Sequence, residues 1–279
     1  DTVFHPQTLP DLSNLLTMSG MMEYLGATSF GNHRSVLQFD FKESLPDLGP
    51  NELLIQVAYV ELNPVDLQKL NAKPSQDVPN PPLIVGYGGS GTVLEVGSGL
   101  VNQRTDWVGQ LVAFLCDARR PGAYATHVAV HVQSVAKIPF AISLEHAATV
   151  PLAGCTAYES LVKLQIQPST PDQHRKLLIV GGSGGVGSWA TLLARARYPH
   201  LEIICTAGSE LSQNWCLRNG ATRVVPHSSL VANLGGGRDG SVDYILCLST
   251  PTKELANDMS ELIRPYGHVC LVAPPKESL

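Results

Sequence analysis

The sequence has 279 residues, of which 44% are hydrophobic and 15% are charged. This composition predicts a globular protein with a sizeable core and excludes an intrinsically disordered one. The formal net charge of −5 gives no electrostatic reason to expect nucleic acid or an anionic membrane as a partner. No apolar run approaches the length needed to cross a bilayer, and the first residues show no secretory signal pattern, so we expect a cytoplasmic protein.

The six cysteines form no C-x-x-C pair, and most of them lie in apolar runs. We therefore expect buried, reduced thiols rather than a disulfide framework or a structural zinc site.

The first half of the chain predicts many short strands separated by proline and glycine turns. Residues 1–17 are irregular and predict a flexible leader. The expected strands are 20–28, 36–42, 52–62, 91–96, 110–115 and 123–129. Their number and spacing favour a compact β-barrel-like domain, which we expect over residues 18–148.

Residues 144–164 have a helical pattern. Ser143 is a candidate N-cap and Glu145 is favourable in the first turn. Because Pro151 cannot continue a helix, we expect two shorter helices here.

From residue 176 the pattern changes to alternating strands and helices. The expected strands are 177–180, 202–206, 223–225, 244–247 and 269–272, and the expected helices include 211–219, closed by Gly220, and 253–263, followed by Pro265. This alternation predicts a doubly wound parallel sheet, which we expect over residues 149–279. The triple glycine at 235–237 is expected to be a plain loop.

A glycine-rich turn follows the first of these strands. Residues 182–187 read Gly-Ser-Gly-Gly-Val-Gly, which fits G-x-G-x-x-G, and a helical pattern follows over 189–196. In such a turn the glycines permit a tight bend, a close approach of the backbone to a pyrophosphate, and close packing of helix on strand. The helix N-terminus then offers unpaired N–H groups to the anion. The order of strand, turn and helix predicts dinucleotide binding.

Several further motifs follow one another in a characteristic order. They are Asn-Pro-Val-Asp at 63–66, Gly-Tyr-Gly-Gly-Ser-Gly-Thr-Val at 86–93, Glu-Val-Gly at 95–97, Gly-Ala-Tyr-Ala at 122–125, Ser-Leu-Glu-His-Ala-Ala at 143–148, Pro-Leu-Ala-Gly at 151–154, Thr-Ala-Tyr at 156–158 and the glycine turn. In this order the sequence resembles the medium-chain dehydrogenase/reductase superfamily, in particular its zinc-independent quinone oxidoreductase-like branch, often named zinc-type alcohol dehydrogenase-like. The resemblance implies an α/β protein with a GroES-like β-barrel catalytic domain followed by a Rossmann domain.

The resemblance also bears on metal binding. The family's first cysteine ligand position falls in the 63–66 segment, its Gly-His-Glu segment reads Gly86-Tyr87-Gly88, and its third position is Leu152. Catalytic zinc needs cysteine or histidine ligands, so we expect no catalytic zinc, and the nearby Cys155 lacks partners for one.

Without zinc, the resemblance implies hydride transfer from NADPH to a quinone or to the β-carbon of an α,β-unsaturated carbonyl, followed by protonation. Asn63 resembles the family residue beside the nicotinamide, and Tyr59 or Tyr87 could donate a hydrogen bond to the substrate. Half-buried packing is an equally good interpretation of each tyrosine. Asp66 is expected to be a cap or turn residue, and His127, His131 and His146 to be surface or satisfied histidines.

The end of the second Rossmann strand favours NADPH over NADH. An acidic residue there would accept from the ribose hydroxyls of NADH, but residues 206–209 are small and neutral, and Glu210 comes one position later. The lysine common in NADPH-using relatives is Ser212 here, and Arg218 is a candidate cation that has a solvated helix face as its alternative role. The expected cofactor-binding residues are Gly182, Ser183, Gly184, Gly185, Val186, Gly187, Thr156, Thr206, Ala207, Ser209, Cys247, Leu248 and Ala273.

The sequence stops just after the fifth Rossmann strand, where the family continues with another strand and a return segment that often forms the dimer edge. We therefore expect a C-terminally truncated Rossmann domain with 269–273 at an open sheet edge, and a homodimer is one candidate oligomeric state. The leading functional hypothesis is an NADPH-dependent reductase of quinones or activated alkenes. The alternatives are a non-catalytic nucleotide-binding relative and an enoyl reductase acting on acyl thioesters.

Overall fold

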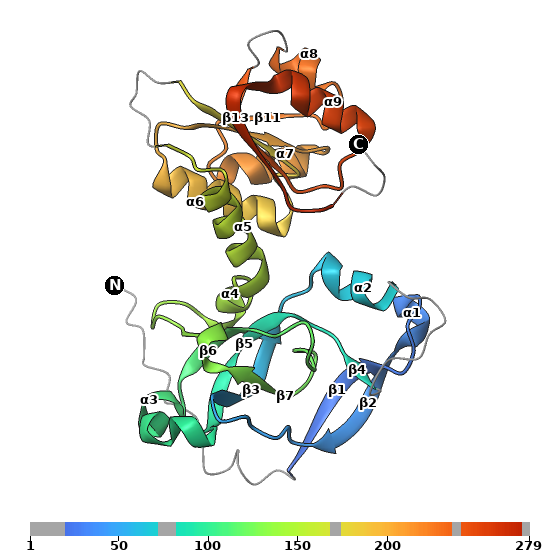
Figure 1. Ribbon diagram of the computed structural model, residues 1–279, viewed down its shortest axis with the longest axis vertical. Helices are drawn as coiled ribbons and strands as arrows, with labels where there is room; N and C mark the ends of the chain where they lie inside the picture. Colours follow the sequence, from blue (N-terminus) through green and yellow to red (C-terminus); the bar gives the residue numbers. More distant parts are fainter. Residues whose placement is uncertain (1–19, 72–81, 168–173, 236–240, 275–279) are drawn as a thin grey trace. The chain divides into compact units, whose positions relative to one another are not determined.

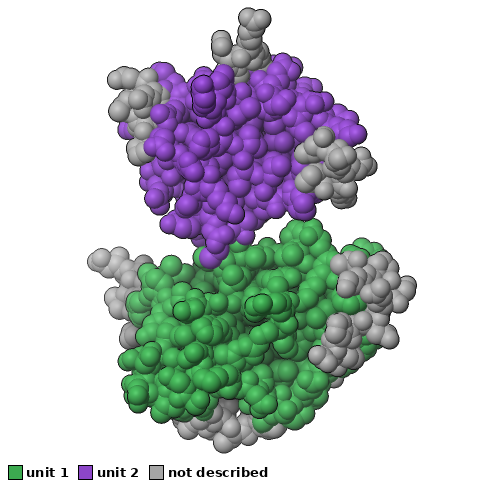
Figure 2. Space-filling model, in the orientation of Figure 1, with its two compact units in different colours: residues 1–152 green, residues 153–279 purple. Residues whose placement is uncertain are grey.

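The computed structural model describes residues 20–71, 82–167, 174–235 and 241–274. The chain divides into two compact units, Asp1–Leu152 and Ala153–Leu279 (Figure 2). We expected the boundary after residue 148, and it lies four residues later because the start of the next helix, at Pro151 and Leu152, contacts Gly88 and Glu61 of the first unit. The expected leader, residues 1–17, and part of the 235–237 loop lie outside the described residues.

Unit 1 is built on two antiparallel sheets (Figure 1). One has the order β7-β3-β5-β6-β8 and the other the order β2-β1-β4. The strands are β1 Met21–Ala27, β2 Leu37–Ser44, β3 Glu52–Val60, β4 Leu83–Ile84, β5 Gly88–Val96, β6 Leu111–Leu115, β7 His127–His131 and β8 Val135–Lys137. Alternate residues of the larger sheet, among them Leu53, Ile55, Val112 and Phe114, are buried in one hydrophobic core.

The strand expected over 123–129 begins only at His127. The preceding residues run between the two sheets instead: Tyr124 accepts from the N–H of Leu25 and donates to Val85, and Thr126 donates to Glu23. Contacts this distant in sequence leave no local signal, which explains the wrong boundary.

The remaining elements of unit 1 are short: α1 His33–Val36, α2 Pro64–Asn71, η1 Ser98–Gln103, α3 Arg104–Trp107, η2 Val132–Ser134 and α4 Leu144–Ala148. The predicted break at Pro151 is confirmed, because α4 ends at Ala148 and α5 (Pro151–Lys163) begins at the proline. Ser143 caps α4 by accepting from the N–H of His146.

Unit 2 contains a five-stranded parallel sheet with the order β11-β10-β9-β12-β13. Its elements are β9 Lys176–Val180, α6 Gly185–Arg197, β10 Glu202–Thr206, α7 Glu210–Arg218, β11 Arg223–Val225, α8 Leu230–Leu234, β12 Val242–Cys247, α9 Lys253–Leu262 and β13 Ile263–Leu271. This strand order is that of a doubly wound Rossmann sheet, as predicted.

Both faces of this sheet are buried. Leu177 and Ile179 of β9 pack in a cluster with residues of α5, α6 and α7, whereas Leu178 and Val180 pack in a second cluster with residues of α8 and α9. Burial on both faces explains why the central strands read as continuous apolar runs rather than as alternating ones.

The last strand differs from its predicted extent. Pro265, expected to follow the helix, lies inside β13, which starts directly at the end of α9. A proline is tolerated there because β13 is an edge strand and the register to β12 shifts between Val242 and Tyr244. Among the described strands β13 is the last of the sheet, and its residues Val269 and Leu271 are exposed. Within the described segments, no helix has the length and apolar character that crossing a membrane requires.

Candidate functional site

The glycine turn lies at the carboxyl edge of the unit 2 sheet, between β9 and α6. The N–H of Gly182 donates to Thr206 at the end of β10 (3.1 Å), and the N–H of Leu248, after β12, donates to Val180 at the end of β9 (3.1 Å). The ends of three strands therefore meet at the turn. Successive strands are added on one side of β9 up to β11 and on its other side from β12 onward. The point between β9 and β12 where this order reverses is where ligands bind in open α/β sheets.

The three glycines of the G-x-G-x-x-G pattern have different surroundings. A Cβ atom at Gly187 would lie 2.4 Å from the carbonyl oxygen of Gly181, and one at Gly182 would lie 2.5 Å from Cβ of Cys205. At Gly184 the nearest atom would be 3.6 Å away, and Gly184 is exposed. The first and third glycines are therefore required by internal packing. The second has open space in front of it.

The turn suits an anion. Gly184 is the N-cap of α6 and makes no side-chain cap bond, so the N–H groups of the first helical turn have no partner within the helix. The positive end of the helix dipole lies at the same place. The backbone at Gly184, with open space where a Cβ would be, leaves room for a pyrophosphate, so the residues present fit a dinucleotide.

Helix α5 flanks the turn. A Cβ at Gly185 would lie 3.7 Å from Cβ of Ala153, and Thr156 follows Ala153 by three residues on α5. Positions three apart share a helix face, which places Thr156 on the side of α5 that carries Ala153.

At the end of β10, Thr206 is buried and its hydroxyl oxygen accepts from the N–H of Gly181 (2.9 Å). Ala207 and Gly208 follow, and the Ser209 hydroxyl caps α7 by accepting from the N–H of Ser212 (3.2 Å). The small side chains expected at this strand end are therefore at the edge of the turn.

The ends of β12 and β13 complete this edge. Cys247 is fully buried, burial raises the pKa of its thiol, and its carbonyl accepts from the N–H of Val272 (3.0 Å). Leu248 approaches Gly181, whose added Cβ would lie 3.6 Å from Cβ of Leu248. Ala273 comes directly after Val272. The expected cofactor residues of unit 2 thus gather at one sheet edge, although Cys247 presents only its backbone there.

In unit 1, Asn63 precedes helix α2 and Asp66 lies in its first turn. The Asp66 carboxylate accepts from the backbone N–H of Asn63 (2.8 Å), which is the expected capping role. The same oxygen accepts from the Tyr124 hydroxyl (2.8 Å), and burial followed by this bond raises the pKa of Tyr124.

Two polar atoms of this cap have no partner among the described residues. They are Nδ2 of Asn63 and Oδ1 of Asp66, and both are buried. Buried polar atoms normally have partners, so an unsatisfied donor and an unsatisfied acceptor three residues apart in one cap indicate a place where a ligand or water can bind.

Tyr87 is half-buried near the same cap. Burial, and then the Asp66 charge, raise the pKa of Tyr87. The ammonium group of Lys69, on α2, lies 5.8 Å from the centre of the Tyr87 ring and donates to the carbonyl of Ala118 (2.8 Å). Tyr59 lies on β3 with 44% of its surface exposed.

Glu61 is a member of this region that sequence reasoning missed. Its carboxylate is buried and accepts from the N–H of Leu152 in the first turn of α5 (2.7 Å), and a Cβ at Gly88 would lie 2.4 Å from it. Its only sequence signal is an acidic residue directly after an apolar strand, and nothing local reveals the partner 91 residues away.

Residues 49–140 match the alcohol dehydrogenase GroES-like domain. A zinc-type alcohol dehydrogenase-like protein of Staphylococcus aureus is 33% identical over 236 residues, which are 83% of this chain and 67% of that protein. The 2-methylene-furan-3-one reductase of Solanum lycopersicum is 28% identical over 202 residues, which are 71% of this chain and 50% of the reductase. The solved quinone oxidoreductase from Coxiella burnetii has a TM-score of 0.76 at 23% identity, over 89% of this chain and 74% of that one.

The chain belongs to the medium-chain dehydrogenase/reductase superfamily. It is an oxidoreductase of this superfamily with quinone oxidoreductase-like relatives, and its GroES-like and Rossmann-type domains confirm the predicted fold class.

By the resemblance described above, the ligand positions of zinc-dependent members fall in the 63–66 segment, in Gly86-Tyr87-Gly88 and at Leu152, and here the Glu61 carboxylate accepts from the N–H of Leu152. Among the described residues, no group of three or more histidine, cysteine or acidic side chains is placed to hold a metal ion. The absence of catalytic zinc stays a prediction.

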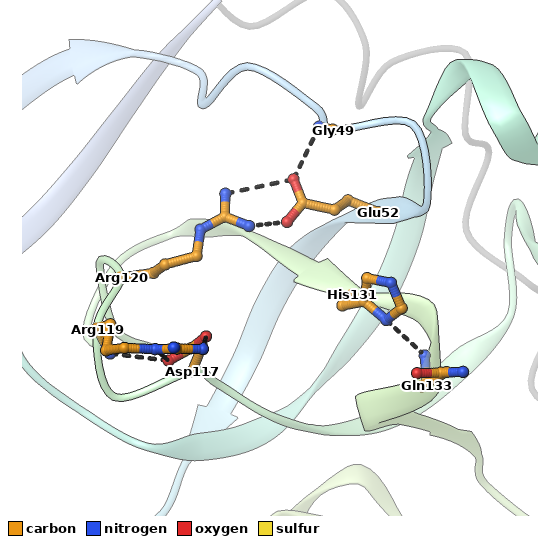
Figure 3. A network of polar contacts seen from close by, with 7 residues as sticks. All are labelled: Gly49, Glu52, Asp117, Arg119, Arg120, His131 and Gln133. Carbon is orange, nitrogen blue, oxygen red and sulfur yellow. Dashed lines mark hydrogen bonds and ion pairs between the residues drawn. The ribbon is translucent and has the colours of Figure 1, made fainter.

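A separate polar network joins three loops of unit 1 (Figure 3). Glu52, which is buried, accepts from the N–H of Gly49 (2.8 Å) and pairs with the guanidinium of Arg120. These residues border two cavities of about 500 and 400 Å³. The other residues of the network are Asp117 paired with Arg119, and His131 accepting from the N–H of Gln133. The Glu52–Arg120 pair links the turn at 49–52 to residue 120, whereas the other two contacts are local, each joining residues two apart in the chain.

The other two histidines considered in the sequence also have local partners, as expected. His127 bonds Thr126 (3.1 Å) and His146 bonds Ser143 (2.8 Å).

Proposed function

We propose that this protein is an NADPH-dependent reductase that transfers hydride, without zinc, to quinones or α,β-unsaturated carbonyls. The observation that carries the proposal is the contrast within the glycine turn. Gly182 and Gly187 are fixed by packing, but Gly184 is a glycine that the fold itself does not require, at an exposed helix N-terminus. A bound pyrophosphate explains this glycine.

The substrate class rests on the superfamily and on the unit 1 residues. The Solanum relative is named as a reductase of an enone, 2-methylene-furan-3-one. NADPH, when bound, supplies the hydride that forms the new C–H bond at the β-carbon of an enone. The electron pair of the carbon–carbon double bond moves towards the carbonyl, and a proton must then reach the α-carbon.

We assign the stabilisation of this charge to hydrogen bonds from unit 1. The unsatisfied Nδ2 of Asn63 is a donor held in place by the Asp66 cap. Tyr87 is a second donor, since a phenol is protonated at neutral pH and the half-buried ring lies near the Asn63–Asp66 cap. Tyr59 is exposed and is the weaker candidate for this role. Such donors replace the charge stabilisation that zinc supplies elsewhere in the superfamily.

The test is a calorimetric titration of the protein with NADPH and NADH, followed by NADPH oxidation with a panel of quinones, enones and enoyl thioesters. Tight NADPH binding with turnover of quinones or enones supports the proposal. Binding without turnover would instead identify a non-catalytic nucleotide-binding relative. A preference for thioesters would identify an enoyl reductase.

Gly184→Val is the matched variant for this test. Gly184 has φ −73° and ψ 173°, which any residue can adopt, and its Cβ would contact nothing closer than 3.6 Å, so the variant should fold normally. The valine side chain would block the approach of the pyrophosphate, and NADPH affinity should fall at least about tenfold. Unchanged affinity in a folded variant would contradict the assignment of the turn. As a comparison, Gly187→Ala should lose folding itself, because its Cβ overlaps the Gly181 carbonyl.

A further inference from the structure

His227 lies against the end of β10, beside the residues that we assign to the adenosine half of the cofactor. It is exposed in the segment between β11 and α8, and its Nδ1 lies 2.8 Å from the hydroxyl oxygen of Thr206. A Cβ at Gly208 would lie 3.5 Å from Cδ2 and 3.8 Å from Nε2 of His227. The imidazole ring therefore borders Gly208 at the strand end where a dinucleotide places its ribose.

The hydrogen-bond chain fixes which ring nitrogen carries a proton. The Thr206 hydroxyl oxygen already accepts from the N–H of Gly181 (2.9 Å), and Thr206 is fully buried. A buried hydroxyl hydrogen needs an acceptor, and within the described part of the chain the one in contact is Nδ1 of His227. With Nδ1 accepting, the neutral ring carries its hydrogen on Nε2; when the ring is protonated, Nε2 carries a hydrogen as well. In both states Nε2 is a donor next to Gly208.

The other candidate groups near this strand end are occupied or distant. Ser209 and Ser212 bond each other at the cap of α7 (3.0 Å). Arg218, considered above as a cation, lies in the last turn of α7 with its guanidinium 5.6 Å from the centre of the Trp215 ring. At 1.5 Å rise per residue, the nine steps from the cap at Ser209 to Arg218 put Arg218 about 13.5 Å along the helix from the cap. We therefore assign Arg218 to the solvated face of α7 and not to the cofactor.

We propose that His227 selects NADPH over NADH by donating its Nε2–H to the 2′-phosphate, and that Thr206 is the positioning residue that orients it. The inference rests on the proposed function, because it needs a dinucleotide bound at the glycine turn. A phosphate accepts strongly from an imidazole N–H, and more strongly when the ring is charged, whereas the 2′-hydroxyl of NADH gains far less from the same donor. Gly208 leaves the space in which the phosphate meets the ring.

The experiment measures dissociation constants of NADPH and NADH by calorimetry for the whole chain and four variants. His227→Ala should weaken NADPH about tenfold and leave NADH unchanged, which is the loss expected for one hydrogen bond to a charged group. His200→Ala is the matched control, because His200 is an exposed histidine at the opposite, amino end of β10. It should change neither constant.

Thr206→Val tests the positioning role. It keeps the shape of the side chain and removes both the bond to His227 and the acceptor of the Gly181 N–H. Loss of the Gly181 bond should weaken NADPH and NADH alike, so the positioning role is read from the ratio of the two dissociation constants, which should move away from NADPH. In the double variant Thr206→Val/His227→Ala, the preference should fall no further than in His227→Ala alone, because both changes remove the same contact.

The outcomes separate the two levels of inference. If wild type binds NADPH and His227→Ala keeps the same ratio of NADPH to NADH affinity, the role of His227 is wrong and the proposed function stands. If wild type binds neither nucleotide, the proposed function fails and the inference fails with it.

Discussion

Thiol reactivity is a residue-scale property that burial determines in this protein. Burial raises the pKa of Cys116 and of Cys205 to about 12, and it also raises the pKa of Cys216 and Cys247. Because the thiolate is the reactive form, a raised pKa leaves almost none of it at neutral pH, and the fraction grows only as the pH rises towards the shifted value.

We predict that iodoacetamide near neutral pH labels the folded protein at Cys155, the exposed cysteine, well before these four. Peptide mass spectrometry measures the order of labelling, and the urea-unfolded chain, in which all six cysteines should react alike, is the control. Rapid labelling of Cys116 or Cys205 in folded protein would contradict the described packing.

For single residues, the sequence predicted chemical roles well but did not predict which distant residues they contact. Asp66 as a cap followed from residue type and local spacing, and the structure confirms it. Four of the six cysteines are buried as expected, whereas Cys155 is exposed and Cys270 is intermediate. Glu61 and His227 were not predicted as site residues, because their partners, Leu152 and Thr206, are 91 and 21 residues away in the chain.

Among the elements, α5 depends on a residue outside itself. It begins with Pro151, and the N–H of Leu152 in its first turn is satisfied by the Glu61 carboxylate. A negative charge at a helix N-terminus also interacts favourably with the helix dipole.

We predict that Glu61→Ala lowers the free energy of unfolding by about 1–3 kcal/mol, because it leaves a part-buried N–H without an acceptor. Glu61→Gln keeps an acceptor oxygen and should cost less. Urea unfolding followed by circular dichroism measures both, with Glu159→Ala, an exposed glutamate on α5, as the control. An equal loss in the alanine and glutamine variants would argue against the hydrogen bond as the cause.

The elements that sequence patterns predicted well are those with local signals. The helix break at Pro151 was predictable because a proline interrupts a helix whatever surrounds it. The strands of unit 2 were recognisable as continuous apolar runs. The extent of β13 was wrong because its proline is acceptable only at a sheet edge, and edge position is a property of the assembled sheet.

On the scale of the whole molecule, each unit has its own hydrophobic core. The core of unit 1 is formed by the larger antiparallel sheet, and unit 2 has one cluster on each face of its parallel sheet. A ligand that binds only folded unit 2 stabilises that unit by mass action.

We therefore predict that scanning calorimetry resolves two unfolding transitions and that NADPH shifts one of them. At about 100 times its dissociation constant, NADPH should add about 2.7 kcal/mol, which corresponds to roughly 10 °C for a unit of this size. Gly184→Val should abolish the shift while both transitions remain. A single transition that moves as a whole would show that the two units unfold together.

The fold class was predictable because the order of several weak motifs along the chain is specific even where each motif is not. The same order identified the glycine turn and the 63–66 segment as the parts that carry chemistry, and the geometry of each is described above. The order of motifs did not predict the hydrogen bonds between segments that are distant in the chain.

The unequal surroundings of Gly184 and Gly187 have an evolutionary consequence. Selection for folding alone protects Gly187, whereas only selection for nucleotide binding protects Gly184. In a lineage that had stopped using the cofactor, codon 184 would accumulate substitutions while codon 187 stayed glycine. Aligned orthologues, read at these two codons, therefore record whether the cofactor has remained in use.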